Sequence, residues 1–196
     1  MSFAIISLRR IKKLNITNAE NDISEILFTE EQIKARVAEL GAMLSEEYKD
    51  SCPVVACVLK GASVFYADLV REMKGHMLFD FISVSSYGLK TTSSGVINLR
   101  KDFDNDIKDK DLLIVEDIVD SGFTLKYLKN LLYARKAKSV KTIAFLNKFE
   151  CHAPELDTDY YGFKIPNEFV VGYGLDYAGY YRNLPYIGVL KRSVYE

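Results

Sequence analysis

Three carboxylates stand directly in front of a turn that contains glycine and hydroxyl residues: Glu116, Asp117 and Asp120 precede Ser121–Thr124. If a helix begins at this turn, its first backbone N–H groups are unpaired and can bind an anion. The serine and threonine hydroxyls add further donors, and Gly122 lets the backbone approach closely. The turn therefore predicts a binding site for a phosphate monoester.

The acidic residues need a different partner, because a carboxylate repels phosphate. Glu116 and Asp117 can accept hydrogen bonds from vicinal ribose hydroxyls, or they can hold a hard cation that phosphates share. Asp120 then remains for proton transfer. The plainer alternative is an ordinary turn, with Thr124 as helix N-cap and the acids favoured by the helix dipole.

The segments on either side of this turn have the patterns of a strand and a helix. Leu112–Val115 is a run of four apolar residues, typical of a parallel strand buried on both faces. After the turn, leucines recur at helical spacing, at Leu125, Leu128, Leu131 and Leu132. Open α/β sheets build ligand crevices from strand, turn and helix in this order, so we favour the ligand site over the ordinary turn.

The rest of the chain repeats this alternation. Residues 28–48 predict a helix that starts at a capping box of Thr29 and Gln32, and its apolar stripe is Ile33, Val37, Leu40, Leu44 and Tyr48. A second helix follows Lys60-Gly61 and contains Phe65, Leu69 and Met73. Strands are predicted at Val54–Leu59, Phe79–Val84, Val96–Leu99, Ser139–Leu146 and Pro185–Leu190.

These elements predict an α/β fold with a mostly parallel central sheet flanked by helices. We expect a single domain over residues 1–196, with a core at about residues 28–150. Tyr160–Tyr181 is rich in aromatic residues and too interrupted by glycine for a long helix. It predicts a small cap, at about residues 151–184, beside the carboxyl ends of the strands.

Composition excludes several classes of function. The net charge is −1, so the chain lacks the overall charge of a nucleic-acid binder. Its three cysteines are dispersed and match neither a disulfide framework nor a zinc site, which favours a reducing cytoplasmic setting. There is no apolar run of membrane-spanning length and no signal-peptide pattern. The two histidines fit no serine-hydrolase or metal-ligand spacing.

Val115–Thr124, V-E-D-I-V-D-S-G-F-T, resembles the phosphoribosyl pyrophosphate motif of the type I phosphoribosyltransferases, in particular their hypoxanthine-guanine branch. The resemblance implies that Asp120 handles the purine N7 proton and that Glu116 and Asp117 hold the ribose hydroxyls or a magnesium ion. It also implies that the turn binds the 5′-phosphate, through Ser121, Gly122, Phe123 and Thr124. Some relatives have lysine at the position of Phe123, so a lysine contact cannot be carried over.

Two further loops agree with this family. The L-K-G sequence at Lys60 and Gly61 resembles the loop that touches pyrophosphate, although a K-G pair is also a common exit from a strand. The polar stretch Ser85–Gly95 resembles the flexible catalytic loop, with Ser86 and Tyr87 at the matching Ser-Tyr pair. A mobile lid suits this chemistry because an activated ribosyl carbon reacts with water unless the site closes. A plain hairpin connection is the alternative.

The base-binding residues are implied in the same way. Lys148 follows a predicted strand, where a lone lysine is commonly a solvated surface residue; in the purine enzymes a lysine here donates to the exocyclic oxygen of the base. Lysine is donor-only, so it suits a 6-oxopurine and mismatches the 6-amino group of adenine.

Gly162–Leu184 resembles the family's base-binding and cap region. By that match Phe169 stacks on the purine, Val170 presents its backbone to the base edge, Asp176 helps hold magnesium and Arg182 grips pyrophosphate. Two further residues are implied beside the base, Ile118 and Leu175. Without the resemblance, Phe169 would be taken as core.

The family implies a Mg²⁺-dependent enzyme of purine salvage. It would transfer the phosphoribosyl group from phosphoribosyl pyrophosphate to hypoxanthine or guanine, as a homodimer or homotetramer without nucleic-acid or membrane partners. The alternative is a regulatory relative that senses a nucleotide and binds RNA. A dinucleotide-binding oxidoreductase is disfavoured because no G-x-G-x-x-G follows any strand.

Overall fold

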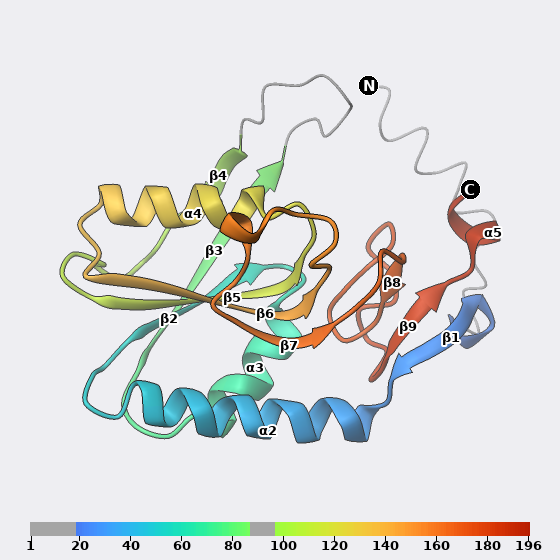
Figure 1. Cartoon of the computed structure of the whole chain (residues 1–196), viewed down its shortest axis with the longest axis horizontal. Coiled ribbons are helices and arrows are strands. Elements are labelled where there is room, and N and C mark those ends of the chain that lie inside the picture. Colours follow the sequence, from blue (N-terminus) through green and yellow to red (C-terminus); the bar gives the residue numbers. More distant parts are fainter. Residues whose placement is uncertain (1–18, 87–96) are drawn as a thin grey trace. The chain divides into compact units, whose positions relative to one another are not determined.

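The computed structural model describes residues 19–86 and 97–196. Two compact units make up the chain: the larger comprises Arg36–Asn167, and the smaller joins the chain up to Ala35 with Glu168–Glu196. Each unit has its own sheet, shown with its helices in Figure 1. None of the helices in the described residues is long and apolar enough to cross a membrane.

The larger unit is built on a six-stranded sheet with the order β4-β3-β2-β5-β6-β7. All neighbouring pairs are parallel except β3 and β4, which are antiparallel. The strands are β2 (Val54–Leu59), β3 (Leu78–Ser86), β4 (Ile97–Lys101), β5 (Asp111–Val119), β6 (Ser139–Asn147) and β7 (Tyr160–Lys164). The predicted mostly parallel α/β sheet is therefore confirmed, with β7 as a strand that the sequence patterns had not indicated.

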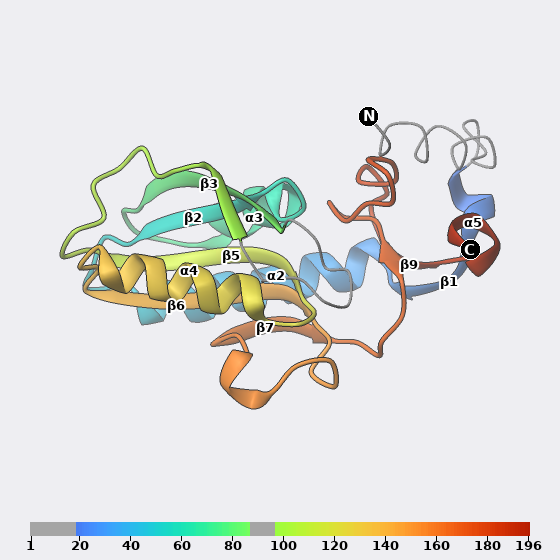
Figure 2. The ribbon, with the colours of Figure 1, turned by 90° about the horizontal axis from the view of Figure 1, so that it is seen from above.

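Helices cover both faces of this sheet. α4 (Phe123–Ala134) lies over one face, and α3 (Ser63–Glu72) and residues 36–47 of α2 (Glu30–Glu47) lie on the other (Figure 1). Seen from above, α4 lies across β5 and β6 (Figure 2). The short 3-10 helix η3 (Pro154–Leu156) contacts α4.

α2 begins at the predicted capping box. The Thr29 N–H donates to Gln32 Oε1 at 2.8 Å, and the Gln32 N–H donates to Thr29 Oγ1 at 3.4 Å. The predicted apolar stripe is buried throughout, at Ile33, Val37, Leu40, Leu44 and Tyr48. The capping box in the sequence therefore predicted the start of α2, and the helical periodicity predicted its packed face.

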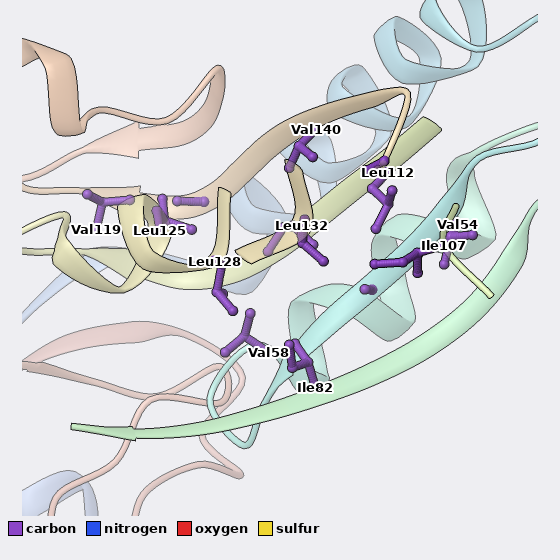
Figure 3. Close-up of a cluster of buried hydrophobic side chains, with 14 residues drawn as sticks. Val54, Val58, Ile82, Ile107, Leu112, Val119, Leu125, Leu128, Leu132 and Val140 are labelled. Atoms are coloured by element: carbon purple, nitrogen blue, oxygen red, sulfur yellow. The ribbon is translucent and has the colours of Figure 1, made fainter. Parts of the chain in front are cut away.

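The core on the α4 side of the sheet is continuous. Alternate residues of β2, such as Val54 and Val58, meet Leu112 of β5 and the leucines of α4 (Figure 3). In α4, Leu125, Leu128 and Leu132 are buried. Burying one such leucine contributes about 1.5–3 kcal/mol, so this stripe fixes α4 and the turn in front of it against the sheet.

β5 is longer than the sequence predicts. The apolar run stops at Val115, but the strand continues to Val119 because β6 keeps pairing with it, Glu116 opposite Ala144 and Val119 opposite Asn147. The first two acidic residues therefore lie on the strand itself. Only Asp120 stands in the turn that follows.

The smaller unit contains a three-stranded antiparallel sheet with the order β1-β9-β8. Its elements are η2 (Ala19–Asp22), β1 (Ile23–Phe28), β8 (Val170–Val171), β9 (Ile187–Leu190) and α5 (Arg192–Tyr195). The strand predicted at Pro185–Leu190 is present but belongs to this sheet. β1 was not predicted, because its alternate residues are largely exposed and carry no clear apolar pattern.

Candidate active site

Three central parallel strands place the predicted residues at one edge of the larger sheet. β2 is followed by Lys60 and Gly61, β5 carries the acidic residues at its carboxyl end, and Lys148 directly follows β6. In the sheet order β2, β5 and β6 are neighbours. The carboxyl ends of parallel strands meet at the same edge, which is where open α/β sheets bind ligands.

The K-G turn after β2 and the acidic end of β5 are in direct contact. A Cβ atom at Gly61 would lie 1.4 Å from Asp117 Oδ2, so only glycine leaves room for that carboxylate. Asp117 Oδ1 accepts the Ile118 N–H at 2.8 Å. The peptide bond between Leu59 and Lys60 is cis. Gly61 thus has a packing role, and its role as a pyrophosphate ligand stays a prediction.

Glu116 is buried at the end of β5, next to the carboxylate of Asp117. Burial, and then the neighbouring charge of Asp117, raise the pKa of Glu116 well above its usual range. Burial and these two carboxylates also raise the pKa of the Cys57 thiol to about 12. Burial and the like charge of Asp117 therefore destabilise the ionised form of Glu116, and a hydrogen-bond donor or a cation as ligand would stabilise it.

These two carboxylates fit a magnesium ion that shares substrate phosphates. The described residues contain no group of three or more His, Cys, Asp and Glu side chains that could hold a metal by themselves. Mg²⁺ usually takes only one or two protein carboxylates and completes its coordination with phosphates and water. Glu116 and Asp117 supply that donor set.

Asp120 and Lys148 come together from adjacent strand ends. Lys148 Nζ lies 3.7 Å from Asp120 Oδ2 and donates to Asn167 Oδ1 at 3.4 Å. The Lys148 side chain is almost fully buried, while that of Asp120 is 61% exposed. The alternative that Lys148 is a solvated surface residue is therefore wrong. An accessible carboxylate and a largely buried ammonium can contact one ligand from two sides.

The turn in front of α4 has the geometry of an anion site. Gly122 is the N-cap, with φ of 73°, and among the described residues no side chain caps this helix end. The alternative with Thr124 as N-cap is wrong, since the helix already begins at Phe123. A Cβ at Gly122 would lie 2.5 Å from the Leu156 carbonyl oxygen. The first N–H groups of α4 remain for a ligand.

The other predicted site residues of the larger unit differ in how far their side chains are exposed. Phe123 is 56% exposed at the first position of α4. Ile118 is half-buried near the end of β5. Ser86 is the last residue of β3, but its side chain and the whole of Tyr87 lie outside the described residues. The lid prediction therefore stays a prediction.

The other predicted base, metal and pyrophosphate residues belong to the smaller unit. Phe169 is 38% exposed, so the alternative that it is a core residue is wrong, whereas Val170 in β8 and Leu175 are buried. Arg182 forms an ion pair with Asp176 and donates to the Gly174 carbonyl at 2.5 Å. An arginine held by a single carboxylate retains donors for an anion.

Sequence patterns missed a polar cluster beneath the loop that carries Lys148. Asn147, the last residue of β6, is fully buried. Its Nδ2 donates to Asp157 Oδ1 at 2.7 Å, and its Oδ1 lies 3.0 Å from His152 Nε2. The loop therefore folds back onto the residue next to Lys148. An asparagine at the end of an apolar strand was the available signal.

The chain is similar to known proteins over most of its length. Residues 24–178 match the family model described as "Phosphoribosyl transferase domain". The chain is 50% identical over 177 residues to the hypoxanthine-guanine phosphoribosyltransferase of Bacillus subtilis (strain 168), covering 90% of this chain and 98% of the relative. With the enzyme of that name from Streptococcus thermophilus (strain CNRZ 1066) it shares 46% identity over 176 residues, again 90% and 98% of the two chains.

The fold is similar to that of a solved hypoxanthine phosphoribosyltransferase from Staphylococcus aureus. The TM-score is 0.88 at 43% sequence identity, with 92% of this chain and 99% of the other covered. The similarity thus extends over nearly the whole of both chains.

Proposed function

The chain belongs to the phosphoribosyl transferase domain family, and from this premise we propose that it transfers the 5-phosphoribosyl group of phosphoribosyl pyrophosphate to a 6-oxopurine. Hypoxanthine is the favoured acceptor and guanine a second one, which makes the enzyme part of purine salvage. The products are the nucleoside monophosphate and pyrophosphate. The observation that carries the proposal is the pair of Asp120 and Lys148, 3.7 Å apart beside the turn in front of α4.

We assign Asp120 and Lys148 to binding and deprotonating the purine. The exposed Asp120 carboxylate accepts the N7 proton as the ribosyl carbon bonds to the base. Lys148, whose ammonium can only donate, binds the 6-oxo group; adenine offers a second donor at that position and leaves Lys148 without an acceptor. Phe169 stacks on the ring, with Val170, Leu175 and Ile118 as further contacts of the base.

The phosphoribosyl group is assigned to the other residues of the sheet edge. The 5′-phosphate binds at Ser121–Thr124, through the first N–H groups of α4 and the two hydroxyls. Glu116 and Asp117 accept hydrogen bonds from the ribose hydroxyls and, with Asp176, hold magnesium. When bound, magnesium supplies positive charge for the diphosphate. Lys60, Gly61 and Arg182 bind the departing pyrophosphate, and Ser86 and Tyr87 belong to the closing lid.

We treat residues 1–196 as one catalytic domain, since the family match at residues 24–178 includes parts of both compact units. A homodimer or homotetramer is the assembly expected from the family. Three free cysteines, Cys52, Cys57 and Cys151, favour a reducing cytoplasmic location. The alternative of an RNA-binding regulator has no support among the three relatives compared above, which are named as phosphoribosyltransferases.

The test is release of pyrophosphate from phosphoribosyl pyrophosphate with magnesium, with hypoxanthine, guanine, xanthine, adenine or uracil offered separately. We expect turnover with 6-oxopurines and none with adenine, uracil or the control without base. Turnover with adenine would contradict the role of Lys148. Folded protein that binds the cosubstrate but releases no pyrophosphate with any base would contradict the proposed function and favour the regulator.

A further inference from the structure

Phe169, the proposed stacking residue, belongs to a cluster of three aromatic rings in the smaller unit. The Phe169 ring is stacked on that of Tyr195, with centroids 4.8 Å apart and an interplanar angle of 24°. Tyr177 meets Phe169 with its ring nearly perpendicular, at 5.7 Å and 85°. Tyr195, the penultimate residue of the chain, therefore covers one face of Phe169.

The segment that carries Tyr195 is tied to the rest of the smaller unit. The Lys191 N–H donates to the Asp22 carbonyl at 2.9 Å, and the Glu196 N–H donates to the Arg192 carbonyl at 2.8 Å. Val194 is buried among the apolar residues of this unit. On the other side of the stack, the Leu190 N–H donates to the Phe169 carbonyl at 2.9 Å. The backbone of Phe169 is thus bonded to β9, and Tyr195 lies in the short helix α5 that follows β9.

Phe169 remains partly accessible in this arrangement. An aromatic ring has two faces, and Tyr195 covers one of them while Tyr177 makes a perpendicular contact. Phe169 is nevertheless 38% exposed. Aromatic pairs in stacked geometry gain about 0.5–1.5 kcal/mol beyond the area they bury. A ring supported in this way keeps its plane, whereas an unsupported ring must lose rotational freedom when a ligand stacks on it.

We propose that Tyr195 is a positioning residue of the purine subsite, forming the second layer of a stack in which the base lies on Phe169 and Phe169 lies on Tyr195. The inference rests on the proposed function, because it takes Phe169 as the ring that stacks on the purine. Tyr195 acts through Phe169 and does not touch the base. Its contribution concerns the affinity for the purine and not the transfer step or the binding of phosphoribosyl pyrophosphate.

The experiment compares Tyr195→Phe and Tyr195→Ala with wild-type enzyme in steady-state kinetics for both substrates. We expect Tyr195→Ala to raise KM for hypoxanthine about fivefold, the size of one aromatic stacking contact. KM for phosphoribosyl pyrophosphate and kcat should stay within about twofold. Tyr195→Phe retains the ring and should restore the wild-type KM. Ile26→Ala, which removes a large apolar side chain that is 51% exposed in the same unit, is the control.

Several outcomes would overturn the inference. A wild-type KM for hypoxanthine in folded Tyr195→Ala would do so, and so would equal losses for both substrates, which indicate a purely structural role. A lower KM would mean that Tyr195 occupies the face that the purine needs. If Tyr195→Ala does not fold, as judged from thermal unfolding, Tyr195→Leu decides in its place. Inactive wild-type enzyme would contradict the proposed function itself, whereas active wild-type enzyme with an unaffected variant contradicts this inference alone.

Discussion

The carboxylate of Asp117 occupies the space where any residue other than glycine at position 61 would place its side chain, 1.4 Å from an ideal Cβ atom. The turn after β2 and the end of β5 therefore fit together through one residue each. In the proposed reaction these two segments hold pyrophosphate and ribose, the two groups between which the bond breaks. The turn and the strand end can take these positions because Gly61 has no Cβ atom.

Gly61→Ala should lower kcat/KM about 100-fold, because a displacement near 1 Å of a positioning group can cost that much. The added methyl group must push Asp117 or the turn away. Steady-state pyrophosphate release measures the effect. Thermal unfolding of the variant is the control, because it separates a local effect on the site from a general loss of stability. Unchanged kcat/KM in Gly61→Ala would show that the contact is not required.

Asp120→Asn should keep the affinity for phosphoribosyl pyrophosphate and lower kcat by about 10²–10⁴-fold, the usual contribution of a general base. The amide has nearly the same shape but does not accept the N7 proton. Single-turnover kinetics together with equilibrium binding of the cosubstrate separate the two quantities. Asp68→Asn on α3 controls for loss of a surface charge. Wild-type kcat in Asp120→Asn would assign the proton transfer to another group.

Lys148→Met should raise KM for hypoxanthine strongly, by about 10–100-fold, because the buried 6-oxo group of the base loses a charged donor worth roughly 1.5–3 kcal/mol. Methionine keeps the length of the side chain but donates no hydrogen bond. KM for phosphoribosyl pyrophosphate should change little. Lys110→Met at an exposed position is the control. Equal changes for both substrates would mean that Lys148 supports the site as a whole.

The carboxyl group of Asp80 should make the stability of the protein depend on pH. Burial alone would raise the pKa of Asp80, but hydrogen bonds outweigh it, first those of the Asn105 backbone and side chain and then those of the Asp104 and Phe81 backbones, so that the pKa is lowered. Lys101 Nζ lies 3.9 Å from Asp80 Oδ1. A carboxyl group with a lowered folded pKa stabilises the protein above its unfolded pKa, and the contribution is lost as pH falls through the folded pKa.

Asp80→Asn should therefore lower the free energy of unfolding at pH 7 by about 2–3 kcal/mol. The asparagine side chain replaces one of the two accepting oxygens by an NH₂ group, which faces backbone N–H donors and cannot accept from them. The difference from wild type should narrow at acid pH, where the wild-type carboxylate becomes protonated. Urea unfolding at pH 7 and near pH 3 measures both values. A difference that stays constant with pH would mean that the charge of Asp80 does not contribute.

The sequence by itself determined the central strands, the helices beside them and the residues that follow each strand. β2, β5 and β6 are buried on both faces, so they form apolar runs that can be recognised locally, and α2 and α4 carry apolar residues at helical spacing. Because parallel strands end at one edge of a sheet, Lys60, Asp120 and Lys148 could be expected at the same edge, while the roles of the two lysines followed from the resemblance to the family.

Only the tertiary structure decided the contacts that complete this picture. The fit of Gly61 to Asp117, the hydrogen bonds of Asn147 and the stack of Phe169 on Tyr195 join residues separated along the chain, and such contacts leave no periodic pattern in the sequence. β8 has two residues, too few to show an alternation. β5 extends past its apolar run because β6 supplies hydrogen-bond partners, a cause that lies in a neighbouring strand and not in the residues of β5.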